Sequence, residues 1–354
     1  MTPTVTPPVT TRTGRVDFGR PTLRWRNLRI DVISVVTTAV LVLAALVVSI
    51  FSLGAGDYDI APWDVLRAVF GTGAPFDIVV VREWRAPRVL MALILGALLG
   101  ISGAIFQSLT KNALGSPDVI GFNSGCYFGA RVVILFVGAH SSALLAVGAV
   151  AGGFATAAIV YLLAFKRGIA GFRLIIVGVA VAIMIEAVNT WMILKANLQV
   201  AISAAAWGAG TLANVTNNQV LVVLAGTAVL VVPLAVIARR MPVAQLGDDV
   251  AAALGLRIEA TRVLMLAVGV GCVAMATAFT GPISFVALAA PQLAAQVTRG
   301  GGLRLAPSAA MGAAILAASD AAAQHLLPGQ LPVGVITWGI GGAYLVWLLI
   351  RQSG

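Results

Sequence analysis

Long uninterrupted apolar runs alternate with short polar connections along the chain, and this pattern predicts a bundle of membrane helices. Runs of about 20 apolar residues are long enough to cross the hydrocarbon core of a bilayer as α-helices. Helices are expected because each one satisfies its own backbone hydrogen bonds in lipid. The predicted fold is therefore all-α and polytopic, with about ten transmembrane helices. The expected spans are about 32–53, 89–109, 119–138, 143–165, 173–194, 218–238, 262–280, 283–298, 305–325 and 332–350.

The polar connections predict shorter elements. Residues 61–67 read as an interfacial helix opened by proline, and residues 196–216 as a short helix dipping into the outer face. The Ala-rich stretch 242–258 looks like two short helices separated by glycine turns. Residues 1–30, rich in Thr, Pro and Arg, are expected to form a disordered cytoplasmic tail. They are not read as a cleaved signal peptide, because the run that follows is long enough to span. The remainder, 31–354, is predicted to be one membrane domain.

Composition supports a membrane location. The chain is 60% hydrophobic and 10% charged, against about 25% charged residues in soluble domains. Its net charge of +10 could suggest nucleic acid, but the basic residues lie between apolar runs, where they set topology. Most of them fall at ends that ten spans place inside. We therefore expect a multi-pass protein of the cytoplasmic membrane with both termini cytoplasmic, in contact with lipid and not with nucleic acid. Arg82, Arg85 and Arg88 are an exception to this bias, because the same topology places them outside.

Neither a catalytic site nor a cofactor site is indicated. The chain lacks a Gly-x-x-x-x-Gly-Lys-Ser/Thr loop, the signature of a phosphate cradle. Cys126 and Cys272 show no metal-ligand spacing and are expected to be core residues. His140 and His325 are expected near outer helix ends, where interfacial hydrogen bonding is favoured over a metal site. No cofactor, metal or catalytic residue is therefore predicted.

Glycines recur about every four residues along two neighbouring spans. Small residues at this spacing let helix backbones approach closely in lipid, where packing replaces the hydrophobic effect. Tight helix contact is the favoured interpretation, and sliding during gating is compatible with it. The glycines are Gly96, Gly100 and Gly103 in one span and Gly121, Gly125 and Gly129 in the next.

Ionisable residues inside spans are costly and rarely face lipid. Arg131, Glu186 and Asp320 are of this kind, and each is expected either to bond to another helix or to line a water-filled path. They do not form the chain of carboxylates that suits proton coupling, which argues against a secondary transporter. Candidates for a translocation path are Glu186, Asn189, Ser203 and Trp207.

The stretch from Pro242 to Leu256 carries small apolar residues next to the acidic pair Asp248-Asp249. A helix lying on the membrane is the alternative interpretation, but an acidic pair disfavours contact with anionic lipid. Docking of another protein is therefore favoured.

Several motifs, spread in order over about residues 30–350, resemble the permease subunits of iron-siderophore and vitamin B12 ABC importers, the FecCD type. They are Arg85-Ala86-Pro87-Arg88, Gly100-Ile101-Ser102-Gly103-Ala104, Gln107-Ser108-Leu109-Thr110-Lys111-Asn112, Ser116-Pro117-Asp118-Val119-Ile120-Gly121, Gln245-Leu246-Gly247, Gly281-Pro282-Ile283-Ser284-Phe285-Val286 and Leu331-Pro332-Val333-Gly334-Val335.

The resemblance implies a type II ABC importer permease of ten spans. It further implies a second permease subunit, two cytoplasmic ATPase subunits that hydrolyse ATP, and an external binding protein. The implied function is non-catalytic translocation of a ferric siderophore. Vitamin B12 or haem uptake is the alternative within this class, and an ion-coupled secondary transporter is the alternative from another class.

Residue roles follow from the matching positions. Arg85 and Arg88 resemble outer arginines that form salt bridges with the binding protein, which accounts for the topological exception. Asn112 and Leu114, with Gly171 and Phe172, resemble a cytoplasmic gate. The residues that resemble ATPase-coupling helices are Gln245, Leu246, Gly247, Asp248, Leu254, Gly255, Leu256 and Arg257.

Two positions depart from the common family pattern. Gln292 follows Pro291 where many members have histidine, and this looks more like the ferric enterobactin-type subunits. Because those work as two different chains, a heterodimer with a paralogue is favoured, and a homodimer is the alternative. Gln324 stands where some relatives carry a further outer arginine, which leaves no third docking arginine at that place.

Overall fold

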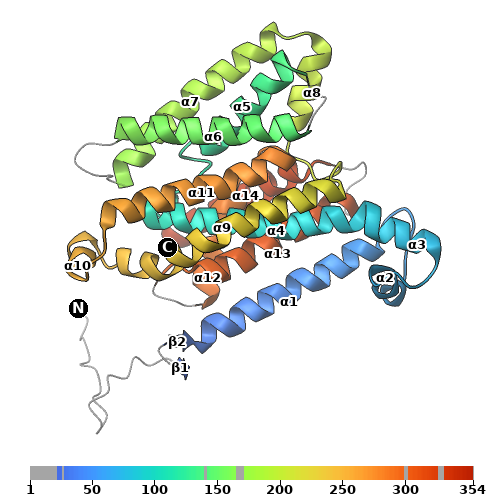
Figure 1. The fold of residues 1–354 in the computed structure, drawn as a ribbon, viewed down its shortest axis with the longest axis horizontal. Helices are drawn as coiled ribbons and strands as arrows, with labels where there is room; N and C mark the ends of the chain where they lie inside the picture. The colour runs from blue at the N-terminus through green and yellow to red at the C-terminus, as the bar shows by residue number, and fades with distance from the viewer. Residues whose placement is uncertain are drawn as a thin grey trace.

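A computed structural model describes residues 22–25, 28–138, 142–164, 171–298, 302–325 and 331–353, which are largely helical. Long helices run between two ends of the molecule (Figure 1). Seven described helical segments are long and apolar enough to cross a membrane, so this is a multi-pass membrane protein. Each expected span coincides with a helix: α1 (Val32–Gly54), α4 (Ala86–Thr110), α5 (Phe122–Phe136), α6 (Ser142–Ala164), α7 (Gly171–Lys195), α9 (Asn217–Ala244), α11 (Ile258–Thr280), α12 (Val286–Thr298), α13 (Leu305–His325) and α14 (Val333–Ser353).

Helix α4 lies at the centre of one group of helices and packs against α9, α11, α12 and α13. Its glycines make this packing close. A Cβ added at Gly103 would meet the backbone of Ala287 in α12, and one added at Gly96 would meet the backbone of Gly312 in α13. The prediction that these glycines serve tight helix contact is confirmed.

A second group contains α5, α6, α7 and α8 (Leu198–Gly208), at the top of Figure 1. Helices α5 and α6 approach at Gly129 and Gly148, each of which has the other's backbone where a Cβ would stand. Contacts between α6 and α11 join this group to the first. Cys126 and Cys272 are both buried, as predicted.

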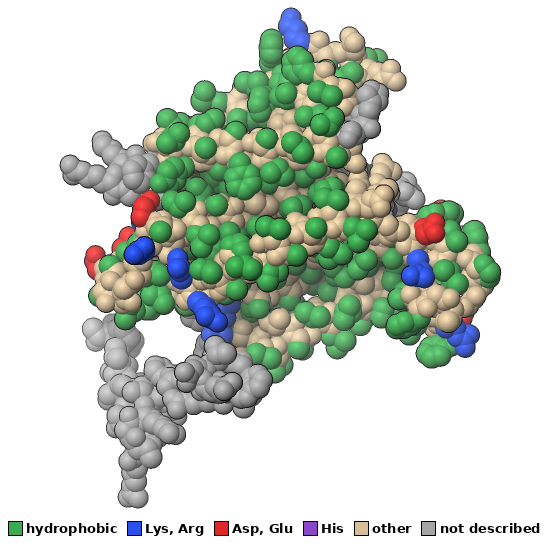
Figure 2. Space-filling view, in the orientation of Figure 1, with side chains coloured by type: hydrophobic (Ala, Val, Ile, Leu, Met, Phe, Trp, Pro, Cys, Tyr) green, Lys and Arg blue, Asp and Glu red, His purple; other side chains and the backbone are tan. Residues whose placement is uncertain are grey.

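Short helices occupy the two ends of the molecule. The α10 end carries α10 (Asp248–Ala253), and the α2 end carries α2 (Pro62–Val69), α3 (Pro75–Val79) and the π-helix η1 (Val80–Arg85). The interfacial helix predicted over 61–67 is α2. Figure 2 shows charged side chains gathered over these two ends, with a mainly hydrophobic surface between them. That distribution suits a protein whose middle lies in a bilayer.

Two helix boundaries differ from the sequence-based expectation. The helix expected to begin near 89 is preceded without a break by α3 and η1 from Pro75. Val80 and Val81 are buried in a small apolar cluster, which stabilises this extension. The wide turn of η1 also precedes Pro87, whose ring is incompatible with a regular i−4 hydrogen bond.

Helix α9 continues past Arg239 and Arg240 to Ala244. Burial of Ile237 and Met241 anchors the added turns to the bundle. The expectation of two short helices in 242–258 is therefore wrong, because α10 is the one short helix that the structure describes there.

The end of the predicted tail also differs from expectation. Strands β1 (Thr22–Trp25) and β2 (Leu28–Asp31) pair antiparallel. The prediction of disorder over residues 1–30 is therefore wrong for these described residues. Asp31 accepts a hydrogen bond from the backbone N–H of Ile33 at the start of α1 (3.1 Å) and pairs with Arg304 (2.9 Å). His140 lies outside the described residues.

Candidate functional site

The α10 end exposes apolar side chains beside charged ones. Gly247 (φ 106°) and Gly255 (φ 81°) flank α10 in a backbone conformation that favours glycine. Leu246, Val250 and Leu254 expose 61%, 49% and 63% of their surface. Exposed apolar side chains grouped at a polar end of a protein mark an interaction surface. The candidate coupling residues thus lie together on and around α10.

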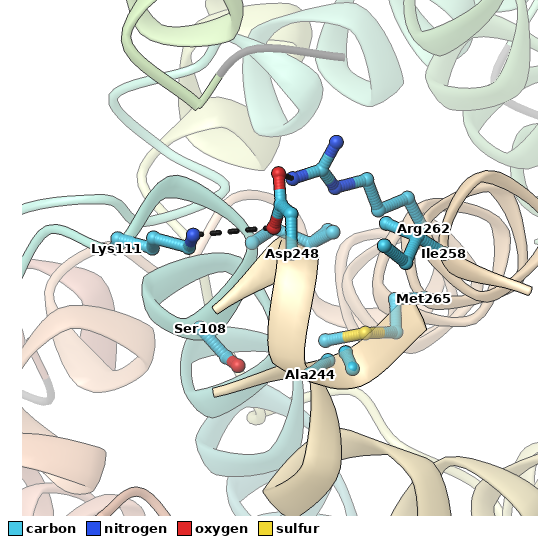
Figure 3. Close-up of a pocket in the computed structure, with 9 residues that line it drawn as sticks. Ser108, Lys111, Ala244, Asp248, Ile258, Arg262 and Met265 are labelled. Atoms are coloured by element: carbon cyan, nitrogen blue, oxygen red, sulfur yellow. Dashed lines mark hydrogen bonds and ion pairs between the residues drawn. The ribbon is translucent and has the colours of Figure 1, made fainter. Parts of the chain in front are cut away.

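Asp248 connects α10 to two other segments, as Figure 3 shows. Its Oδ1 lies 3.3 Å from Lys111 Nζ and its Oδ2 lies 2.8 Å from Arg262 Nη2. Burial raises the pKa of Asp248, but hydrogen bonds and charges from Lys111 and Arg262 outweigh this and hold the pKa below its ordinary value. The carboxylate is therefore ionised at neutral pH, and its ion pairs weaken only as the pH falls through that lowered pKa. We call these three side chains the Asp248 latch.

The candidate gate residues lie next to the latch. Lys111 ends α4 in a left-handed conformation (φ 51°), and Asn112 Oδ1 then accepts a hydrogen bond from the Leu114 N–H (2.8 Å). Gly171 begins α7 against the end of α4, since its Cβ would lie 2.7 Å from the Thr110 carbonyl oxygen. Leu114 and Phe172 are exposed. The structure thus brings the turn after α4 and the start of α7 together, as expected.

Glutamine side chains form further links at this end that sequence reasoning missed. Gln292 donates to the Ala113 carbonyl and accepts from the Tyr344 hydroxyl (2.9 Å). Gln245 donates to the Leu303 carbonyl (3.2 Å). Both line a cavity of about 490 Å³ beside the turn after α4. From the sequence, Gln292 was recognised only as a family marker. Its hydrogen-bond partners could not be predicted because they are distant along the chain.

At the α2 end, Arg85 binds backbone carbonyls. Its Nη1 donates to the carbonyls of Leu53 (2.8 Å) and Gly54 (3.0 Å), and its Nη2 donates to that of Tyr58 (2.7 Å). A cation at these carbonyls satisfies the unpaired acceptors at the C-terminus of α1 and complements the helix dipole. Arg85 therefore holds the 53–58 turn in place.

Arg88 pairs with Asp320 of α13. Its Nε lies 3.1 Å and 3.0 Å from the two carboxylate oxygens, and its Nη2 lies 2.8 Å from Oδ1. The side chains are only 12% and 3% exposed, and Gln324 Nε2 donates to Asp320 (2.7 Å). Of the two outcomes expected for Asp320, the structure shows the interhelical bond. Both predicted docking arginines thus make internal contacts, whereas Arg82 is exposed.

The candidate path residues are only partly assembled. Glu186 is exposed and accepts a hydrogen bond from the buried Asn189 (Nδ2 to Oε2, 3.4 Å). Ser203 donates to Gln199 of its own helix (3.0 Å). Trp207 stacks on Tyr127 of α5, with centroids 5.6 Å apart. Sequence reasoning did not single out Tyr127.

The molecule thus has two ends with charged side chains, joined by a glycine-packed helical bundle. Residues 42–351 match the FecCD transport family. The chain belongs to this family. The match covers Arg85, Arg88 and the residues of α10, so this FecCD protein carries both regions within the family domain.

Permease proteins of iron-chelate transport systems are similar to this chain over most of its length. The chain is 44% identical over 319 residues to the ferric enterobactin transport system permease protein FepG of Escherichia coli, covering 90% of this chain and 96% of that one. It is 33% identical to the achromobactin transport system permease protein CbrC of Dickeya dadantii, covering 93% and 97%. It is 32% identical to the iron(3+)-hydroxamate import system permease protein FhuG of Bacillus subtilis, covering 90% and 97%.

A solved structure has a similar fold. A metal-chelate type ABC transporter in an inward-facing conformation matches with a TM-score of 0.79 at 26% identity, covering 89% of this chain and 98% of that one. The polytopic α-helical membrane fold predicted from the sequence is confirmed. Membership in a family of ABC importer permeases implies an ATPase and a binding protein as partners.

Proposed function

We propose that this protein is the transmembrane permease subunit of a binding-protein-dependent ABC importer that carries a ferric siderophore across the cytoplasmic membrane. The similarity to iron-chelate permeases over nine tenths of the chain carries the proposal. ATP hydrolysis belongs to a separate subunit, and this chain is non-catalytic. A second permease subunit completes the path, and a paralogue of this chain is favoured over a second copy of it. Two ATPase subunits complete the importer.

The proposal is tested by uptake of a radiolabelled ferric chelate into vesicles that contain the permease pair and its ATPase, with the binding protein outside. Uptake should require ATP and the binding protein. Uptake driven by an ion gradient without the ATPase would overturn the proposal in favour of a secondary transporter.

We place the α10 end in the cytoplasm together with both termini, and the α2 end outside. Arg239, Arg240, Arg257 and Arg262 lie near the α10 end, and basic residues favour the cytoplasmic side. On this orientation, the exposed apolar side chains of α10 meet the ATPase. Asn112, Leu114, Gly171 and Phe172 form the cytoplasmic gate beside it.

The Asp248 latch is proposed to pass movement of α10 to the gate, because Lys111 directly precedes Asn112. Asp248→Lys should reverse this attraction and lower uptake per ATP hydrolysed about fivefold or more, since an exposed ion pair contributes up to about 1 kcal/mol and repulsion adds to its loss. The measurement is the ratio of transported iron to hydrolysed ATP.

Asp249→Lys is the matched control, because Asp249 is an exposed neighbour for which the described residues show no ion pair. Combining Asp248→Lys with Lys111→Asp should recover part of the coupling by restoring one attractive pair. Equal losses for Asp248→Lys and Asp249→Lys would exclude the latch.

Arg85 and Arg88 are proposed to receive acidic residues of the binding protein. Arg85→Glu should lower the affinity of the binding protein about tenfold, as expected for a charge-assisted contact of about 1.5–3 kcal/mol. Arg82→Glu makes the same charge change at an exposed position and should cost less. Affinity is measured on the lipid-embedded complex, and thermal unfolding reports any loss of the Arg85 contacts to α1. If both variants weaken binding equally, Arg85 has no specific docking role.

A further inference from the structure

Asp118 lies in the connection between α4 and α5, and its carboxylate contacts two separate parts of the chain. Its Oδ1 accepts a hydrogen bond from Asn123 Nδ2 (3.0 Å), and its Oδ2 accepts one from the backbone N–H of Phe285 (3.2 Å). No ion pair joins it to a cation within the described part of the chain. Hydrogen bonds to a charged acceptor are the stronger kind in proteins. Asp118 therefore ties the connection after α4 to the start of α12.

Two helix N-termini compensate the charge of this carboxylate. Asn123 is the second residue of α5. Phe285 directly precedes α12, and its carbonyl accepts from the backbone N–H of Ala289 (2.8 Å), as that of the residue before a helix does. Helix N-termini carry partial positive charge and stabilise nearby carboxylates. Asp118 thus holds the first turns of α5 and α12 together without a cation.

A hydroxyl group of α11 fixes the orientation of Asn123. Thr277 donates to Asn123 Oδ1 (2.7 Å), the shorter of its two hydrogen-bond contacts, so the amide presents its Nδ2 to Asp118. The side chains of Asn123 and Thr277 are both buried. Thr277 lies one helical turn before Gly281, where α11 ends. The contacts therefore run from α11 through α5 to Asp118, and from there to the start of α12.

The backbone between α11 and α12 is strained. Phe285 has a φ of 69°, in the left-handed region that a bulky residue rarely adopts. Its ring packs against α14 at Gly341, where a Cβ would overlap the ring. Strained residues persist only where their surroundings fix them, and they cluster at functional sites. Phe285 is therefore held in this conformation from two sides, by Asp118 and by α14.

Helix α12 binds the connection after α4 at a second point. Gln292 of α12 is buried and donates to the Ala113 carbonyl. Asn112 and Leu114, the proposed gate residues, flank Ala113. The segment that carries the proposed gate is thus attached to α12 at Ala113 and again at Asp118.

We propose that Asp118 is a positioning residue for transport. It fixes the gate segment to α12, so that the gate opens when α12 and this segment move as one body. Helix α12 packs against α4, α13 and α14, and its movement is therefore passed to the rest of the bundle. The inference rests on the proposed function, because it assigns Asp118 a role within the proposed cytoplasmic gate.

Asp118→Asn tests this role, because it preserves the shape of the side chain but replaces one carboxylate oxygen with an amide nitrogen that faces a donor. Uptake of a radiolabelled iron chelate per ATP hydrolysed should fall about tenfold, as expected for the loss of a hydrogen bond to a charged group. The assembled importer is measured in lipid vesicles. Its ATPase rate should equal that of the wild type, which shows that the variant folds and assembles. Asp64→Asn makes the same change in α2 and should leave uptake per ATP unaltered.

Thr277→Val tests the same contacts without changing a charge. It removes the hydroxyl group that orients Asn123 and should lower uptake per ATP severalfold. Thr280→Val is the matched control, since Thr280 is buried in the same helix but its hydroxyl donates to the carbonyls of Ala276 (2.9 Å) and Gly281 (3.2 Å). If Asp118→Asn does not fold, the comparison of the two threonine variants decides the outcome.

A distance measurement tests whether the segment moves with α12. Nitroxide labels are placed at Val119 and Val297, which are 40% and 54% exposed, in a chain whose buried Cys126 and Cys272 are replaced by alanine. Electron–electron resonance should give the same label distance with and without ATP. In Asp118→Asn the distance should differ between the two states, which a purely stabilising contact does not predict.

Three results would each overturn the inference. They are uptake per ATP in Asp118→Asn equal to that in Asp64→Asn, equal uptake per ATP in Thr277→Val and Thr280→Val, and a wild-type label distance that changes with ATP. ATP-dependent uptake by the wild type separates the two proposals. Its absence removes the proposed function, whereas normal uptake with unaltered coupling in the variants removes only the role of Asp118.

Discussion

Asp320→Ala should destabilise the permease by about 3–5 kcal/mol, the cost of leaving one member of a buried ion pair without its partner. Arg88 approaches Asp320 through two nitrogens at 2.8–3.1 Å, and both side chains are nearly inaccessible. The loss should appear as a lower midpoint of thermal unfolding for the purified protein in detergent.

Two comparisons make this expectation specific. Arg88→Met combined with Asp320→Leu should recover most of the stability, because replacing both ions with apolar groups leaves no buried charge. Asp64→Ala removes an exposed pair with Arg67 (3.6 Å), and such pairs contribute up to about 1 kcal/mol. Similar losses for Asp320→Ala and Asp64→Ala would show that the buried pair is not a stabilising contact.

Gly103→Val should have the second large effect, at or above the upper end of the roughly 1–3 kcal/mol typical of overpacking. A Cβ at this position meets the backbone of Ala287, and backbone cannot move aside as a flexible side chain can. Helices α4 and α12 would have to separate, so the folded fraction after membrane extraction should fall sharply.

Gly339→Val in α14 is the matched control. Gly339 has open space around the position of a Cβ and lies within a regular helix. Its folded fraction should equal that of the wild type in size-exclusion chromatography. If Gly103→Val extracts and elutes like Gly339→Val, close α4–α12 contact is not required for folding.

The positions of the helices were largely predictable because they depend on local information. The length of each apolar run decides whether a segment can cross a bilayer, and a helix pairs its own backbone groups. Errors arose where contacts elsewhere extended a helix. Buried Val80 and Val81 support the turns before α4, and buried Met241 supports the end of α9.

The candidate site was predictable in part. Family motifs indicated both ends and placed Gly171 beside the turn after α4, where the structure has it. They did not indicate how individual side chains are paired. No motif indicated that Arg88, a docking candidate, also binds Asp320, 232 residues away. Asp248 was one of eight coupling candidates, and its distinction comes from Lys111 and Arg262, which the fold brings to it.

Hydrophobic run length and motif order are written along the chain, so they specify the class of protein, its helices and the two ends where partner subunits are expected. Which charges are neutralised depends on how the helices pack in the folded protein. Arg88 and Asp320 satisfy one another, whereas Arg131 is packed against an aromatic ring with two nitrogens unpaired. The energy of a buried ion depends on the groups within a few ångströms of it, and those groups come from distant helices whose packing no local pattern specifies.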